Sequence, residues 1–160
     1  MSLLARAALV AALLFLGAPA KAGSCNPSSD PHDLMVRTVM GEAAGQPYEG
    51  KVAVAAVIRT RVLSGRWGHT VRDVVLARKQ FEPWGRRCRE LMRLSPESPG
   101  WAEASRAVDA ALAADDPTAG ATHFAAVHTV RKRRNRRGLS WIAQLTSVCR
   151  IGSHTFGRSL

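Results

Sequence analysis

Seven consecutive apolar residues, VAVAAVI at positions 52–58, decide the fold class of this 160-residue chain. A run that is apolar on every side belongs in the protein interior, as a buried helix or a buried strand. Its β-branched residues favour a strand, whereas its alanines and the preceding Pro47 favour a helix. We therefore predict a buried central helix in the segment that opens at Pro47.

Three further helices are expected around the central one. The first starts at Pro31, behind a cluster of N-cap residues, and ends within 42–45. Thr70 begins a capping box ahead of a short helix. The last starts at Ser98-Pro99, carries an apolar stripe, and ends before Asp115. No segment makes a convincing strand, and the length suits one domain, so we predict a small, mainly α, single-domain fold.

The N-terminal segment has the composition of a secretory signal peptide. An unbroken apolar run covers 7–16, and Ala20-Lys21-Ala22 has the small-residue pattern of a cleavage site. The apolar run is about half as long as the ~20 residues that a membrane-spanning helix needs. We therefore expect a signal peptide (1–22), a flexible leader (23–30) and a folded domain (31–160), exported to the periplasm or cell envelope.

The chain is strongly basic, with 23 Lys and Arg residues against 12 Asp and Glu, and its positive charge is concentrated in one run. Such a run is either a solvated, self-repelling loop or a segment that contacts anions. Export makes an anionic envelope polymer a better partner than DNA, so no nucleic-acid partner is expected. The run contains Arg131, Lys132, Arg133, Arg134, Arg136 and Arg137.

The three cysteines, Cys25, Cys88 and Cys149, allow one disulfide in an exported protein. The sequence leaves all three pairings open. We favour Cys88 with Cys149, because Cys25 lies in a Gly/Ser/Pro-rich leader that we expect to lack fixed structure. Their spacing matches no zinc-binding pattern.

The sequence lacks the common catalytic motifs, including the nucleophile elbow, the zinc-binding HExxH helix and the phosphate-binding loop. One acidic residue is unusual. Glu42 follows Gly41, precedes Ala43-Ala44-Gly45, and falls at the expected end of an apolar helix. A carboxylate among small residues could face a cleft and admit a bulky substrate. The alternative, an ordinary solvated residue at a helix end, is not excluded by composition.

Four blocks of sequence carry a family resemblance. They are MGEAAGQPYEGKVAVAAVIRTRV at 40–62, KQFEPW at 79–84, DPTAGATHF at 116–124 and IGSHTF at 151–156. Together they resemble, in the same order, the SleB-type cell-wall hydrolases, the family of the spore-cortex-lytic enzymes. The match spans about residues 33–157. Because it involves four blocks in order, it is far more specific than any one of them.

The resemblance implies a lysozyme-like fold for 31–160 and cleavage of the peptidoglycan glycan strand between N-acetylmuramic acid and N-acetylglucosamine. It also implies that Glu42 is the general acid. A glycosidic oxygen leaves poorly unless it is protonated. A solvated Glu is protonated about 0.2% of the time at pH 7, and one with a pKa of ~6 about 10% of the time, so an apolar site would favour this role.

The second catalytic group decides between hydrolysis and transglycosylation. A hydrolase needs a second carboxylate, for which Glu82 is a better candidate than Glu49, which suits the first turn of a helix. A lytic transglycosylase needs only one acid, because the muramoyl 6-hydroxyl attacks. The family also suggests this single-acid mechanism, and we favour it.

Residues in the family blocks are the candidates for substrate binding. Gln80 could hydrogen-bond sugar groups or cap local structure. The aromatic residues could stack on sugar rings or be buried, and the histidines could line the cleft or be structural. No cofactor is expected, and a metal site built from His123, His128 and His154 is not implied. The candidates are Gln80, Phe81, Glu82, Trp84, His123 and His154.

A protein of another class remains the alternative. A catalytically silent, cationic murein-binding or secretion-accessory module could keep the fold and dock on peptidoglycan through its charge. A nucleic-acid binder would rest on the basic run alone. We expect a monomer that acts on peptidoglycan.

Overall fold

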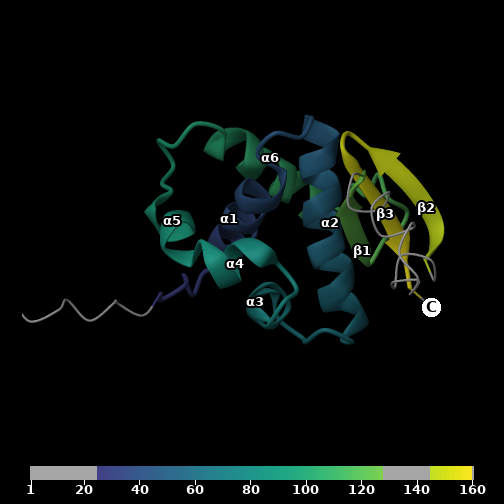
Figure 1. Cartoon of the computed structure of the whole chain (residues 1–160), viewed down its shortest axis with the longest axis horizontal. Helices are drawn as coiled ribbons and strands as arrows, with labels where there is room; N and C mark the ends of the chain where they lie inside the picture. Colours follow the sequence, from purple (N-terminus) through teal and green to yellow (C-terminus); the bar gives the residue numbers. More distant parts are fainter. Residues whose placement is uncertain (1–24, 128–144, 160) are drawn as a thin grey trace, which may run out of the picture.

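The computed structural model describes residues 25–127 and 145–159. The expected signal peptide (1–22), the basic run (131–137) and His128 lie outside these residues. Figure 1 shows α2 standing between a group of helices and a small sheet. The helices are α1 (Pro31–Ala43), α2 (Tyr48–Ser64), α3 (Val71–Leu76), α4 (Glu82–Arg86), α5 (Cys88–Arg93) and α6 (Trp101–Leu112). The strands are β1 (His123–Ala126), β2 (Thr146–Ile151) and β3 (His154–Arg158).

Helix α2 is the central helix that the apolar run predicts. Every residue from Val52 to Ile58 is at most 2% exposed. The helix packs against α1, α3 and α6 on one side and against strands β1 and β2 on the other. It ends at Gly65, whose φ of 68° is the left-handed conformation typical of a glycine C-cap. No helix among the described residues is long and apolar enough to cross a membrane.

The other predicted helices are also confirmed. Helix α1 starts at Pro31, and the Asp30 side chain accepts hydrogen bonds from the backbone N–H groups of His32 and Asp33. Thr70 forms the expected capping box with Asp73 at the start of α3. Helix α6 begins at Trp101, after Gly100 with its φ of 83°, and therefore starts later than the predicted Ser98-Pro99.

The prediction that the chain has no convincing strand is wrong. Three antiparallel strands form a sheet in the order β1-β3-β2, with Phe124 opposite Phe156 and a register shift between Thr146 and Cys149. These strands have only four to six residues. All four residues of β1 are partly buried, so the strand lacks the alternation of buried and exposed positions that marks a strand in a sequence.

A hydrogen-bonded bridge joins the sheet to the loop between α1 and α2. The Gln46 side chain accepts from the Ser153 backbone N–H at 2.9 Å and donates to the Ser153 hydroxyl at 2.7 Å. Gly152, with a φ of 56°, lies against this bridge, and a Cβ there would be only 2.6 Å from Gln46 Oε1. The IGSH turn of the fourth block therefore positions the sheet.

Helix α4 packs closely on α1, just before Glu42. The Trp84 indole N–H donates to the Thr38 hydroxyl at 2.8 Å, and both side chains are buried. Gly41 permits this approach, because a Cβ at that position would lie 2.8 Å from the Pro83 Cβ. Neither α4 nor α5 was predicted, since helices of five or six residues show no hydrophobic periodicity.

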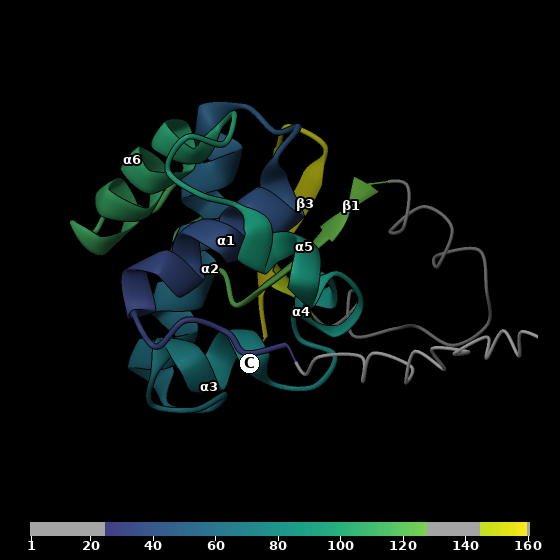
Figure 2. The same cartoon turned by 90° about the vertical axis from the view of Figure 1, so that its left-hand side faces the viewer.

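The favoured Cys88–Cys149 disulfide is wrong, because Cys25 pairs with Cys88. The leader passes α3, where the Arg72 guanidinium donates to the Ser28 carbonyl at 3.0 Å, and brings the Cα of Cys25 to 6.0 Å from that of Cys88. Cys149 is a free cysteine on β2. Figure 2 shows α1 between α6 and α3, and α1 packs against both. The described part of the expected flexible leader is thus held to the domain by a covalent bond and a hydrogen bond.

Candidate active site

Glu42 lies in the last turn of α1 and lines a pocket of about 350 Å³. Its side chain is partly buried, so it is neither open to bulk solvent nor sealed in the core. The opposite wall of the pocket comes from α4 and the residue after it. The lining residues are Gly41, Glu42, Glu82, Pro83, Arg86 and Arg87.

The pocket raises the pKa of Glu42 from an ordinary 4.5 to about 7. Burial is the largest cause, because removal of water disfavours the ionised form, and the negative charge of Glu82 adds to it. A hydrogen bond from the Glu82 backbone and the positive charges of Arg87 and Arg61 act in the opposite direction. About half of the Glu42 side chains are therefore protonated at pH 7.

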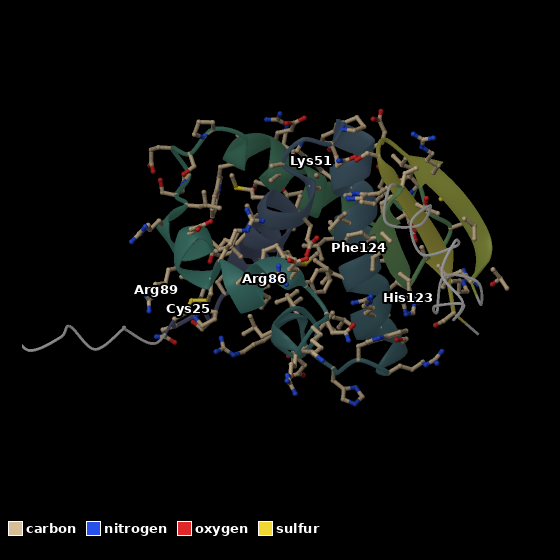
Figure 3. The ribbon with its side chains drawn as sticks, in the orientation of Figure 1. Cys25, Lys51, Arg86, Arg89, His123 and Phe124 are labelled. Atoms are coloured by element: carbon tan, nitrogen blue, oxygen red, sulfur yellow. A yellow bond between two sulfur atoms is a disulfide. The ribbon has the colours of Figure 1, made fainter. Side chains whose placement is uncertain are left out.

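Glu82 faces the same pocket in a different environment. Its side chain is 69% exposed and pairs with Arg86, four residues later in α4, at 2.8 Å. The neighbouring Arg87 donates to the Gly41 carbonyl at 3.0 Å, which ties the end of α4 to the last turn of α1. Figure 3 shows Arg86 on α4 near the middle of the molecule.

Arg61 interacts electrostatically with Glu42 and was not predicted as a site residue. It is only 4% exposed, and its guanidinium donates to the Thr122 carbonyl at 2.7 Å and to Gln80 Oε1 at 3.2 Å. Burial lowers its pKa to about 10, while the nearby Glu42 acts to raise it. The sequence did contain a signal. Arg61 falls four residues after Val57 and seven after Val54, on a buried face of the helix.

The bond from Arg61 fixes the orientation of the Gln80 side chain. Because a guanidinium only donates, the amide oxygen of Gln80 must face it, and the amide N–H groups of this exposed residue remain to donate elsewhere. Gln80 is two residues before Glu82, whose backbone contacts Glu42. The segment 80–82 thus runs from an exposed amide donor to the carboxyl group of Glu42.

For the two aromatic candidates, the structure shows the buried alternative. Phe81 is 2% and Trp84 7% exposed, so neither presents an open ring face for a sugar. The guanidinium of Arg61 lies over the Phe81 ring, 5.3 Å from its centre. Trp84 anchors α4 on α1 through Thr38. Both side chains support the wall of the pocket instead of offering a stacking surface.

The two candidate histidines lie on the sheet, outside the lining of the Glu42 pocket. His123 packs edge-on against Trp67, with ring centres 5.6 Å apart, and its Nδ1 is 2.9 Å from the Thr122 hydroxyl. His154 is 7% exposed and packs edge-on against Phe124 and Phe156. Burial lowers the pKa of both histidines. Figure 3 shows His123 and Phe124 on β1, beside α2.

No group of three or more His, Cys, Asp or Glu side chains in the described ranges is arranged to hold a metal ion. The lining of the Glu42 pocket combines one acid that keeps its proton near neutrality with a second carboxylate and two arginines.

Comparison with known protein families identifies the family of this chain. The model of the family described as Cell Wall Hydrolase matches residues 45–157. The chain belongs to this family. It is 35% identical over 125 residues to a spore cortex-lytic enzyme of Halalkalibacterium halodurans, and 32% identical over 123 residues to one of Bacillus cereus. Each match covers 77% of this chain, but only 33% and 42% of the respective relatives, so the chain spans less than half of their length.

Solved structures of the family confirm the predicted lysozyme-like fold. The catalytic domain of the Bacillus cereus SleB protein superposes with a TM-score of 0.64 at 30% identity, over 83% of this chain and 93% of that domain. The catalytic domain of the germination-specific lytic transglycosylase SleB from Bacillus anthracis gives 0.62 at 29% identity, over 82% of this chain and 97% of that domain. The family resemblance carried by the four sequence blocks is thereby confirmed.

Proposed function

We propose that this chain cleaves the glycan strand of peptidoglycan between N-acetylmuramic acid and N-acetylglucosamine, as a lytic transglycosylase with Glu42 as its general acid. The observation that carries the proposal is the pocket that raises the pKa of Glu42 to about 7. The fold adds support, because it is shared with the catalytic domain of a lytic transglycosylase.

The raised pKa suits the first step of the reaction. As the bond between the glycosidic oxygen and the anomeric carbon of N-acetylmuramic acid breaks, the oxygen must receive a proton. A solvated Glu is almost entirely ionised at pH 7, whereas about half of the Glu42 side chains carry the proton. Glu42 can therefore act as the acid at neutral pH without a metal or cofactor in the step.

The second step needs a base and a nucleophile. In the proposed reaction the muramoyl 6-hydroxyl attacks the anomeric carbon and closes a 1,6-anhydro ring. Glu42, now ionised, accepts the proton of that hydroxyl and is restored, and no water is consumed. One acid thus serves both steps. Glu82, the other carboxylate of the pocket lining, is largely exposed and paired with Arg86, which suits an electrostatic role better than that of a second catalytic group.

Gln80 and Arg61 have a positioning role in this proposal. The amide N–H group of Gln80 donates to an acceptor on the substrate, such as an N-acetyl carbonyl, while Arg61 donates to the amide oxygen and holds it in place. Of the two histidines, His123 is the better candidate for substrate contact, because His154 is almost fully buried.

The proposed substrate also suits the expected export of the chain, because peptidoglycan lies outside the cytoplasm. We propose that the basic run at 131–137, which lies outside the described residues, contacts anionic polymers of the envelope. A fusion of residues 1–22 to a reporter that is active only after export tests whether these residues direct export. A reporter that stays in the cytoplasm would contradict it.

Product analysis tests the reaction. The purified chain is incubated with peptidoglycan sacculi, and the soluble products are identified by mass spectrometry. Products that end in 1,6-anhydro-N-acetylmuramic acid are expected from the native chain and from Glu49→Gln, a matched control on the exposed first turn of α2. None are expected from Glu42→Gln. Reducing ends would indicate a hydrolase, and intact sacculi carrying bound protein would indicate the catalytically silent module.

A further inference from the structure

A second cavity of about 470 Å³ adjoins the acid pocket and has no role in the reaction proposed above. The two cavities share Glu82 and Arg86, so they are neighbours along α4. The second cavity extends from α4 back to the turn after α3. It is lined by Leu76, Ala77, Arg78, Lys79, Phe81, Glu82, Trp84, Gly85 and Arg86.

The cavity is apolar inside and positively charged at its rim. Leu76, Phe81 and Trp84 supply apolar surface, although the two aromatic side chains are themselves mostly covered. Arg78 and Lys79 are exposed, and neither has an ion-pair partner within the described residues. The one carboxylate of the lining, Glu82, is already paired with Arg86. Two cations are thus available to an anionic ligand.

The backbone holds these two cations in a fixed turn. The Gln80 N–H donates to the Ala77 carbonyl at 3.1 Å, which closes the turn that carries Arg78 and Lys79. Lys79 has a φ of 65°, a left-handed conformation that costs a residue other than glycine roughly 1 kcal/mol. Such conformations persist only where the surroundings impose them, and they concentrate at functional sites. The rim therefore has a defined geometry before any ligand arrives.

We propose that this second cavity binds the peptide stem of peptidoglycan through the stem carboxylates. The inference rests on the proposed function, because it places the glycan in the acid pocket next door. The glycan strand itself is neutral, since its amino groups are acetylated and its lactyl carboxyl groups are amide-bonded to the stems. The negative charges of the polymer lie on the stems, which branch from the N-acetylmuramic acid beside the bond to be cleaved.

Charge and position together favour this occupant. A stem attached to a sugar in the acid pocket starts within one saccharide of Glu82, the residue that the two cavities share. Its carboxylates match Arg78 and Lys79, and its aliphatic side chains match the apolar lining. A neutral oligosaccharide would leave both cations without a counter-charge.

The first test measures binding without catalysis. Isolated stem tetrapeptide is titrated into the Glu42→Gln chain, and the affinity is followed by NMR chemical shifts. The double variant Arg78→Gln/Lys79→Gln in the same background should bind about tenfold more weakly, and tetrapeptide with amidated carboxyl groups should show a similar loss. Arg106→Gln on the exposed face of α6 is the matched control and should bind like its parent. Equal affinity for the charged and the amidated peptide would overturn the proposal.

The second test measures cleavage. The ratio of kcat/KM on stem-bearing glycan to kcat/KM on glycan stripped of its stems should be about ten for the native chain and near one for the double variant. An unchanged ratio in the double variant would overturn the inference. A native chain that binds the tetrapeptide but cleaves neither glycan would instead overturn the proposed function, so the two failures can be told apart.

Discussion

The two walls of the acid pocket present the same functional group in opposite environments. On α1, Glu42 is partly buried, and its pKa rises to about 7. On α4, Glu82 is 69% exposed and pairs with Arg86. The difference shows that position, not residue type, selects the acid, as in other enzymes with two unequal carboxylates. It also assigns Glu82 an indirect effect, because its charge helps Glu42 to keep a proton.

Neutralising each carboxylate in turn tests most directly whether the two have different roles. Glu42→Gln should lower kcat/KM on peptidoglycan by about 10³-fold or more, because it removes the proton donor. Glu82→Gln should cost less than about tenfold at pH 7, because it removes only a nearby charge. Initial rates of anhydromuropeptide release measure both. Equal losses of about 10³-fold would mean that Glu82 is a second catalytic carboxylate and that the single-acid mechanism is wrong.

A glycine sets the spacing between the two walls. A Cβ on Gly41 would lie 2.8 and 2.9 Å from Pro83 atoms and 3.1 Å from Leu91 Cδ2, so Gly41→Ala should push α4 away from Glu42. We expect a loss of roughly 10²-fold in kcat/KM, since a displacement of about an ångström can cost that much.

Gly45→Ala is the matched control, because a Cβ there meets nothing within 4 Å. It should keep nearly full activity and stability. A Gly41→Ala chain with native activity would show that the close contact of α4 with α1 does not set the geometry of the acid.

Much of the α1 wall was predictable, and most of the α4 wall was not. The apolar residues of α2, the proline at the start of α1 and the capping box at Thr70 are local signals that act within one or two turns. They predicted α1, α2 and the short helix α3, and they placed Glu42 at a helix end. The role of Glu42 as the general acid was implied only by the resemblance of the four sequence blocks. Composition alone was equally consistent with an ordinary solvated residue.

The errors arose where contacts between distant segments decide the structure. The disulfide depends on the path of the leader past α3, which no local pattern encodes. The burial of Phe81 and Trp84 depends on where α4 packs. The short strands form because β3 pairs with β1 on one side and with β2 on the other. A buried Arg61 was detectable from helical spacing, but its bond to Gln80 was not.

The disulfide joins Cys25 in the leader to Cys88, the first residue of α5, just after the α4 wall of the pocket. Cys25 and Cys88 are separated by 63 positions, and closing a loop of that length should stabilise the fold by about 2 to 4 kcal/mol. The double variant Cys25→Ser/Cys88→Ser should therefore lower the free energy of unfolding by that amount in urea titrations. Cys149→Ser, which removes the free cysteine, is the control and should change stability little. Native stability in the double variant would show that the disulfide does not stabilise the fold.

The raised pKa of Glu42 also predicts how stability depends on pH. Because the folded pKa of about 7 exceeds the ordinary 4.5, the folded state binds this proton more tightly than the unfolded state. This group therefore makes the chain less stable as pH rises from about 4.5 to 7. Glu42→Gln, which cannot ionise, should gain about 3 kcal/mol over the native chain at pH 8 and little at pH 4. A gain that is independent of pH would contradict this linkage.

The central claim is that the pocket keeps a proton on Glu42 near neutrality. A carbon-detected NMR titration of the Glu42 carboxyl, assigned by its absence in Glu42→Gln, measures this directly. We predict a midpoint near pH 7, and a lower midpoint in Glu82→Gln because the neighbouring negative charge is gone. A midpoint near 4.5 in the native chain would mean that the pocket does not retain the proton, and it would contradict the assignment of Glu42 as the general acid.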